Sequence, residues 1–197
     1  MSLVTMIYVV SGLPRSGTSL AMQMLAAGGL PILSDGLRQS DSNNPRGYSE
    51  WERIKQLPQE PNLIVEAEDK AVKVISSLLF AVPPDREYRV IFMLRPIEEV
   101  QASQAAMIRT LGTQAPALPA EAMQAALKAH LAQVNAGIAG RQGAGGFPVL
   151  RVNYHDLIAD PRRIAQSMAG FLGRPLNVEA MARQVDPALY RQRLTPA

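Results

Sequence analysis

The stretch Gly12-Leu13-Pro14-Arg15-Ser16-Gly17-Thr18-Ser19 decides how the rest of the 197-residue chain is interpreted. It follows an apolar, β-branched run at Thr5–Val10, which predicts a buried strand. It leads into Ser16–Ala27, whose apolar spacing predicts a helix that ends at Gly28 and Gly29. The spacing Gly-x4-Gly-x-[Ser/Thr] between a strand and a helix is typical of a phosphate-binding loop. In such a loop, backbone N–H groups and the positive end of the helix dipole bind an anion.

Strands and helices alternate after this loop. Apolar runs predict strands at Pro31–Ser34, Arg89–Leu94 and Pro148–Val152, and a strand and a helix within Ala71–Ala81. Further helices are predicted over Tyr48–Leu57, Ile97–Leu111 and Ala120–Ala139, with short helices after the last strand. The predicted connections are Asp35–Gly47, Gln114–Pro119 and Arg141–Gly146.

This alternation predicts an α/β fold with three layers, in which a central, mainly parallel sheet is flanked by helices. We expect residues 1–197 to form one domain, because the chain is too short for two domains of ordinary size. Ligands of such sheets lie beyond the carboxyl ends of the strands. The loops after Val10, Leu94 and Val152 should therefore converge on one site.

Composition narrows the class of protein. Because the sequence has no cysteine, disulfides, thiolate catalysis and cysteine metal sites are excluded, and its two histidines argue against a multi-histidine metal site. The N-terminus lacks the basic start of a signal peptide, and no run approaches the ~18 apolar residues of a membrane span. We therefore expect a cytoplasmic protein without a membrane partner. The net charge is +3, but the arginines are scattered, so we expect no nucleic-acid partner.

Two departures from a nucleoside triphosphatase change the expected ligand. A triphosphatase has Lys at the position of Thr18, whereas this chain places its cation at Arg15, within the loop. The predicted strand Arg89–Leu94 is followed by Arg95, where an Asp that helps to hold magnesium is expected. The site therefore suits an anion that is not a magnesium-bridged triphosphate.

With the loop, two later segments resemble the sulfotransferase superfamily, in particular bacterial members and tyrosylprotein sulfotransferases. Val90-Ile91-Phe92-Met93-Leu94-Arg95-Pro96, followed by Ser103, resembles the 3′-phosphate motif of that family. Leu150-Arg151-Val152-Asn153-Tyr154-His155-Asp156-Leu157, with Asp160-Pro161 and Phe171-Leu172-Gly173 after it, resembles the third block of the family.

The resemblance implies a metal-independent enzyme that uses 3′-phosphoadenosine 5′-phosphosulfate (PAPS) as its co-substrate. Such an enzyme moves the sulfuryl group of PAPS to a hydroxyl or amine. The acceptor would be a small molecule, a glycan or a peptide, and the sequence does not choose among these classes. The chain could also form a homodimer.

The resemblance gives roles to individual residues. Arg15 would contact the phosphosulfate and offset charge on its bridging oxygen during transfer. Arg95 and Ser103 would bind the 3′-phosphate, and Tyr154 would lie near the nucleotide. The cradle around the phosphosulfate would come from Ser16, Gly17, Thr18 and Ser19.

Plainer interpretations of these residues stay open. Arg15 could be a solvated loop residue, and Tyr154 could be a core aromatic. Arg95 could form a structural ion pair with Glu98 or Glu99.

The acceptor needs a general base, and two carboxylates after the first helix are candidates. Asp35 falls about where the tyrosylprotein branch has its acidic pair. Glu50 ends an Asn-Pro-x-Gly-Tyr-x-Glu element that resembles one in bacterial members. The sequence does not decide between them. Lys70 or Lys73 could supply a second cation to the sulfonate.

One departure from the family lies near the C-terminus. Many eukaryotic members have an Arg-Lys-Gly…Gly-x-Trp segment that closes over the adenine, and this chain lacks it. Arg191 or Arg193 could substitute. Two other functions stay open: a P-loop kinase or nucleotide hydrolase that uses Arg15 in place of Lys, and a nucleotide-binding module without catalysis.

Overall fold

A computed structural model describes residues 5–41, 44–112, 118–143 and 147–193. Its strands form one four-stranded sheet in the order β2-β1-β3-β4, and every neighbouring pair is parallel. The strands are β1 (Met6–Gly12), β2 (Ala71–Lys73), β3 (Glu87–Leu94) and β4 (Val149–Asn153). The expected central parallel sheet is confirmed.

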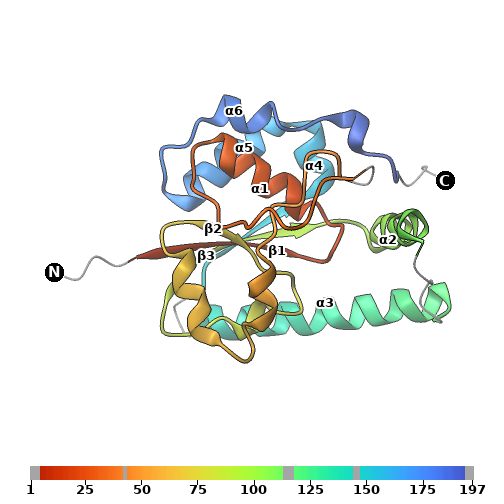
Figure 1. Cartoon of the computed structure of the whole chain (residues 1–197), viewed down its shortest axis with the longest axis horizontal. Helices are drawn as coiled ribbons and strands as arrows, with labels where there is room; N and C mark the ends of the chain where they lie inside the picture. The colour runs from red at the N-terminus through yellow and green to blue at the C-terminus, as the bar shows by residue number, and fades with distance from the viewer. Residues whose placement is uncertain (1–4, 42–43, 113–117, 144–146, 194–197) are drawn as a thin grey trace.

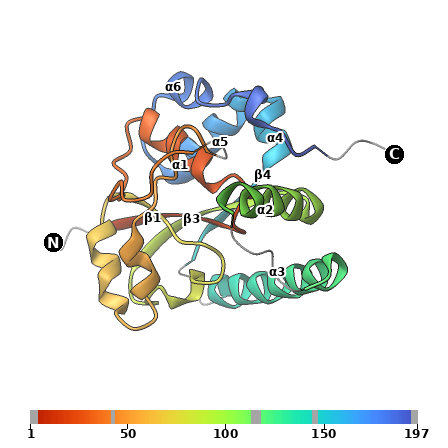
Figure 2. The same cartoon turned by 45° about the vertical axis from the view of Figure 1, so that its right-hand side comes forward.

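Helices cover both faces of this sheet in both views (Figures 1 and 2). One layer holds α1 (Thr18–Ala27), α4 (Tyr154–Ala159), α5 (Pro161–Leu172) and α6 (Val178–Ala182). The other layer holds α3 (Ala120–Gly143) and the short 3-10 helices η1 (Glu52–Gln56), η2 (Pro61–Ala67) and η3 (Leu79–Ala81). At the carboxyl end of the sheet lie α2 (Ile97–Leu111) and the C-terminal segment with η4 (Pro187–Leu189).

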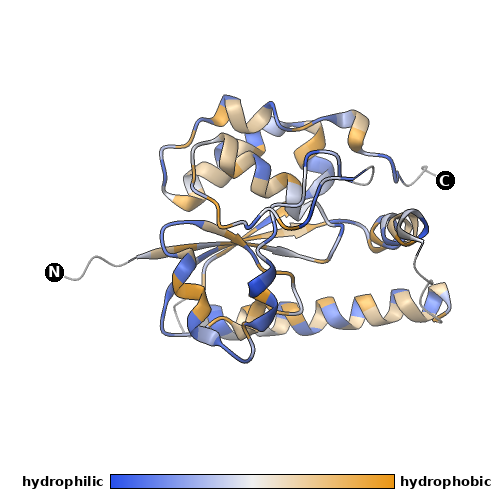
Figure 3. Ribbon diagram, viewed as in Figure 1, coloured by the Kyte–Doolittle hydropathy of each residue, from blue (hydrophilic) through white to orange (hydrophobic). Residues whose placement is uncertain are grey.

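Each strand contributes to two separate cores, because its side chains alternate between the faces of the sheet. In β3, Val90 and Phe92 pack into the layer of α3, whereas Ile91 and Met93 pack into the layer of α1. A strand that is buried on both faces has a continuous apolar sequence, which is the pattern that identified β3. Figure 3 shows apolar and polar residues alternating along the helices of both layers, as expected when one side of each helix packs on the sheet.

The predicted helix Ile97–Leu111 is confirmed with the same bounds. Two other predictions are wrong. The expected strand Pro31–Ser34 is only a single bridge between Ile32 and Ala71. The expected helix Tyr48–Leu57 is only the 3-10 helix η1, because Ser49 has a φ of +48°, which a right-handed helix cannot accommodate.

Three further boundaries differ. The expected helix within Ala71–Ala81 is the three-residue turn η3. The Ala-rich helix α3 continues to Gly143, so residues 141–143 are helical, whereas 144–146 lie outside the described residues. In the predicted linker 114–119, residues 118 and 119 are non-helical, and 114–117 lie outside the described residues. Within the described ranges, no helix combines the length and the apolar character that a membrane span requires.

Candidate functional site

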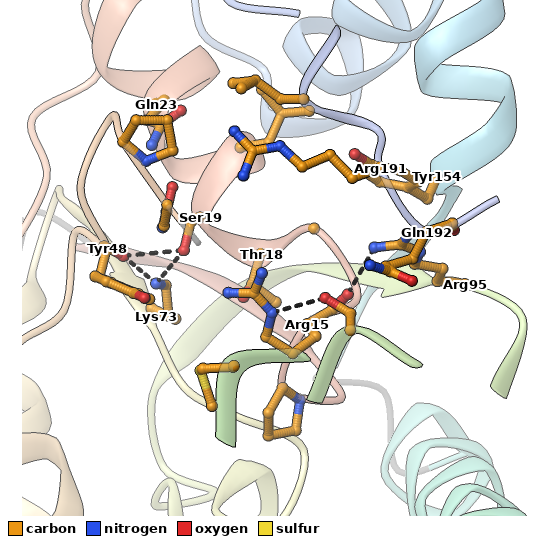
Figure 4. A pocket seen from close by; sticks show the side chains of 18 of the residues that line it. Arg15, Thr18, Ser19, Gln23, Tyr48, Lys73, Arg95, Tyr154, Arg191 and Gln192 are labelled. Atoms are coloured by element: carbon orange, nitrogen blue, oxygen red, sulfur yellow. Dashed lines mark hydrogen bonds between the residues drawn. The ribbon is translucent and has the colours of Figure 1, made fainter. Parts of the chain in front are cut away.

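The chain segments that follow the four strands meet around one pocket at the carboxyl edge of the sheet (Figure 4). Arg15 follows β1, Lys73 ends β2, Arg95 follows β3 and Tyr154 follows β4, and all four line the pocket. The predicted convergence of these loops is confirmed. The pocket has a volume of about 290 Å³, near the lower end of ordinary small-molecule sites.

Backbone geometry fixes the loop between β1 and α1. Gly12, Arg15 and Gly17 have positive φ values of 144°, 76° and 105°. A Cβ at Gly17 would lie 2.6 Å from the ring of Tyr154, and one at Gly12 would lie 2.8 Å from the carbonyl oxygen of Met93. Both glycines are therefore required by close packing as well as by conformation.

The four predicted cradle residues divide into two groups. Gly17, Thr18 and Ser19 line the pocket. Ser16 is buried beneath it at 1% exposure, and its hydroxyl has no hydrogen-bond partner among the described residues. Because α1 begins at Thr18, its first backbone N–H groups also face this end of the loop.

The side chain of Arg15 extends from the loop to α2. Its Nε donates to the hydroxyl of Ser103 at 2.9 Å. Burial lowers the pKa of the Arg15 guanidinium, which starts from a value so high that it stays charged at neutral pH. The predicted site residue Ser103 therefore lies in the pocket in contact with Arg15.

Arg95 links three parts of the site. Its Nε donates to Glu99 at 2.8 Å, and both side chains are buried, with 7% and 1% exposure. Its Nη1 donates to the carbonyl oxygen of Arg15 at 3.2 Å, and its Nη2 donates to that of Gln192 at 3.0 Å. The guanidinium also lies 4.6 Å from the ring centroid of Tyr154. Arg95 thus forms the structural ion pair and lines the pocket at the same time.

Glu99 attaches the C-terminal segment to this site. Its Oε1 accepts from the Tyr190 hydroxyl at 2.5 Å and lies 2.9 Å from Nε2 of His155. Burial and the hydrogen bond to Glu99 raise the pKa of Tyr190 to about 12. This contact places Arg191 in the pocket wall, with its side chain reaching across the pocket in Figure 4. Arg193 instead donates to backbone carbonyls of its own segment.

Lys73 is a second buried cation of the site, with a side chain that is 3% exposed. Its Nζ donates to the carbonyl oxygen of Tyr48 and, at 2.9 Å, to the hydroxyl of Ser19. Burial lowers the pKa of Lys73 to about 8. Lys70, the other lysine considered, is not among the lining residues and donates to the carbonyl oxygen of Glu66.

The two candidate carboxylates lie in different surroundings. Glu50 lines the pocket, where its Oε1 lies 3.5 Å from Nζ of Lys73. Asp35 is exposed and is not among the lining residues. Its carboxylate accepts from the backbone N–H groups of Glu52 at 2.6 Å and Leu37 at 3.0 Å, and these bonds lower its pKa. The geometry therefore brings Glu50 to the site and leaves Asp35 in a loop-bracing position.

Arg38 and Tyr48 are among the lining residues that sequence reasoning missed. Arg38 donates to both carboxylate oxygens of Glu50, at 3.0 and 3.2 Å, and its guanidinium lies 3.6 Å from the ring centroid of Tyr48. The Tyr48 hydroxyl in turn donates to Asp41 at 2.8 Å. Tyr48 belongs to the element that contains Glu50 and could have been considered with it. The position of Arg38 in a long loop offered no comparable signal.

The residues that the structure describes form no cluster of metal-ligating side chains. Among them, no group of three or more His, Asp or Glu side chains lies close enough together to hold an ion.

Comparisons with known proteins concern the fold. No protein-family model matches the chain, and no curated protein matches it in sequence. Solved structures do match. The sulfotransferase domain of the Synechococcus PCC 7002 olefin synthase is 17% identical, with a TM-score of 0.58 over 100% of this chain and 91% of that domain. A sulfotransferase of Mycobacterium tuberculosis H37Rv is 21% identical, with a TM-score of 0.59 over 95% of this chain and 74% of that one.

Retinol dehydratase, solved in a complex with retinol and PAP, is 15% identical and gives a TM-score of 0.53. The match covers 93% of this chain and 64% of the dehydratase. At these identities the likeness shows the fold. The chain has the fold of the sulfotransferases, and the resemblance found in the sequence is confirmed at that level.

Proposed function

Because the chain has the sulfotransferase fold, we propose that it transfers a sulfuryl group from PAPS to a hydroxyl or amine of an acceptor, without a metal. The observation that carries the proposal is the set of charges at the strand ends. Arg15 follows β1, Lys73 ends β2 and Arg95 follows β3, and all three line one pocket. Arg95 stands where a magnesium-dependent P-loop enzyme has an Asp. Cations in this arrangement fit a nucleotide that is anionic at both ends.

The phosphosulfate end would lie over the loop between β1 and α1. The N–H groups at the start of α1 and the hydroxyls of Thr18 and Ser19 would hold its oxygens. Arg15 and Lys73 would stabilise the negative charge that grows on the bridging oxygen as the sulfur–oxygen bond breaks. Both are held in place before the ligand binds, by Ser103 and by Ser19 respectively.

The 3′-phosphate would lie at Arg95. Among the described residues, Nη1 and Nη2 of this guanidinium donate to the backbone carbonyls of Arg15 and Gln192. A phosphate is a stronger, charge-assisted acceptor than a carbonyl, so it would compete well for these donors. Arg191 would add a second cation from the C-terminal segment. The PAP in the retinol dehydratase structure supports a ligand of this type.

Glu50 would accept the proton of the acceptor, since it is the candidate carboxylate that lines the pocket. The test is the transfer of ³⁵S from labelled PAPS to a panel of alcohols, phenols and amines in EDTA, with Asp35→Asn as the control for Glu50→Gln. We expect Glu50→Gln to lower kcat by ~10²–10⁴-fold, as for the loss of a general base, and Asp35→Asn to change it little.

The opposite result for the two variants would make Asp35 the base. PAP binding without transfer to any acceptor would instead indicate a nucleotide-binding module that has lost catalysis.

A further inference from the structure

The pocket has two sides. In Figure 4, Tyr154, Arg95 and Gln192 lie on one side, Tyr48 and Lys73 lie on the other, and Arg15 and Thr18 lie between them. If the nucleotide extends from the Arg95 side to the central loop, the side next to Tyr48 remains for the acceptor. Contacts with these residues place three further lining residues on this side, namely Glu50, Arg38 and Met107.

Arg38 has more N–H donors than it has strong acceptors among the described residues. Its Nη1 makes both contacts with Glu50, whereas Nη2 meets the sulfur of Met107 at 3.7 Å. A side-chain hydrogen bond with Tyr48 also acts on this guanidinium. A thioether is a weak acceptor, and an arginine has five N–H donors in a rigid fork. Part of the fork is therefore left for a ligand oxygen.

The guanidinium is also held in a fixed orientation. It lies 3.6 Å from the ring centroid of Tyr48, and the Tyr48 hydroxyl is itself bonded to Asp41. Stacking on an aromatic face and pairing with Glu50 restrict the rotation of the fork. An acceptor would meet a preorganised anion-binding group on a side chain that is still 35% exposed.

Two cations pair with one carboxylate on this side. Arg38 and Lys73 both approach Glu50, whereas the other carboxylate, that of Asp41, accepts from the Tyr48 hydroxyl. If Lys73 and Arg15 serve the phosphosulfate, Arg38 is the cation that remains for the acceptor. The side chains around this position are mixed: Met107 is apolar, whereas Ser19 and Gln23, which donate to the backbone of Tyr48 and Gly47, are polar.

We infer that Arg38 binds an anionic group of the acceptor, and that the acceptor is an alcohol or phenol that carries a carboxylate or a similar anion. The inference rests on the proposed sulfotransferase function and adds the chemical class of its acceptor.

The transfer needs no group beyond PAPS, the acceptor and Glu50. The acceptor oxygen forms a bond to sulfur while the bond between sulfur and the bridging phosphate oxygen breaks. The electron pair of that bond goes to the bridging oxygen, which gives adenosine 3′,5′-bisphosphate, and the hydroxyl proton goes to Glu50. An anion on Arg38 would weaken its hold on Glu50, so that a carboxylate oxygen becomes available for this proton. Arg38 is then a positioning residue that selects the acceptor.

The test compares phenolic acids with their methyl esters, which differ mainly in the charge. The pairs are 4-hydroxybenzoate, 4-hydroxyphenylacetate and 3-(4-hydroxyphenyl)propionate, each with its methyl ester. Calorimetry measures their binding to the full chain saturated with adenosine 3′,5′-bisphosphate, and kcat/KM for transfer from PAPS is measured separately. The variants are Arg38→Gln and Arg38→Lys. The matched control is Arg53→Gln, since Arg53 also lies over an aromatic ring and pairs with a carboxylate, but outside the pocket.

We expect at least one acid to bind about tenfold more tightly than its ester, as for one charge-assisted hydrogen bond. Arg38→Gln should bring this ratio to about one, Arg38→Lys should retain part of it, and Arg53→Gln should leave it unchanged. An effect of a variant on folding or on Glu50 changes the affinity for the acid and for its ester alike, so it does not change the ratio of the two affinities. Esters that bind as tightly as all three acids would overturn the inference, and so would a preference that survives in Arg38→Gln.

The two readouts separate this inference from the proposed function. Acid-selective binding that depends on Arg38, without any transfer from PAPS, would contradict the proposed function and leave an anion site at Arg38. Transfer to acids and esters with equal efficiency would contradict the assignment of Arg38 alone.

Discussion

Lys73 should make the stability of the protein depend on pH in the alkaline range. Burial lowers the pKa of its ammonium group from 10.5 to about 8 in the folded chain. The unfolded chain, in which the lysine titrates normally, therefore binds more protons between pH 8 and 10.5. The free energy of unfolding must rise with pH over this window, and below it the cost of burying the charge is constant. At ~1.36 kcal/mol for each pKa unit, the shift corresponds to about 3 kcal/mol.

The assay compares the wild type with Lys73→Met by urea unfolding between pH 7 and 10.5. Trp51, the only tryptophan in the sequence, is buried and reports unfolding by its fluorescence. Across this range, the free energy of unfolding of the wild type should rise by about 3 kcal/mol relative to that of the variant. For an m value of ~2 kcal/mol/M, this corresponds to a relative shift of about 1.5 M in the urea midpoint. Groups that titrate equally in both proteins cancel in the difference. A difference that stays constant with pH would refute the account of Lys73 as a buried cation.

Two further predictions concern the loop and the buried ion pair. Gly17→Ala should destabilise the folded protein by ~2–4 kcal/mol in thermal unfolding, because the new Cβ would lie 2.6 Å from the ring of Tyr154. The control is Gly29→Ala, where φ is also positive, at +94°, but no atom lies within 4 Å of the new Cβ. It should cost only ~1–2 kcal/mol. Equal losses would mean that the contact with Tyr154 is unimportant. Arg95→Ala should cost ~3–5 kcal/mol in urea unfolding, because it removes the arginine from the buried carboxylate of Glu99, and adding Glu99→Gln should restore part of the loss. No recovery in the double variant would show that the charge of Glu99 is not the cause.

The fold could be predicted where local signals agree with burial. The helix Ile97–Leu111 has the same bounds in the sequence and in the structure, because Pro96 precedes it and Gly112 ends it in a left-handed conformation. The helix expected over Tyr48–Leu57 failed for the opposite reason. Its apolar residues Tyr48, Trp51, Ile54 and Leu57 are buried, but Ser49 has a positive φ, and apolar periodicity carries no information about backbone conformation at a polar position.

The sequence could predict only those site residues that directly follow a strand. Parallel strands bring Arg15, Arg95 and Tyr154 together wherever their exact bounds lie, so these residues could be predicted to share one pocket. The choice between Asp35 and Glu50 depends on the path of a loop with little regular structure, which local patterns do not encode. The same holds for Arg38 and for the contacts that bring the C-terminal segment over the pocket.

The most direct test of the central claim is a calorimetric titration of the full chain with adenosine 3′,5′-bisphosphate and with ATP, each in EDTA and in magnesium. A pocket with Arg15 in the loop and Arg95 at the end of β3 should bind the bisphosphate equally well with and without magnesium, and ATP weakly in both buffers. Binding of ATP that requires magnesium, with no binding of the bisphosphate, would contradict the account.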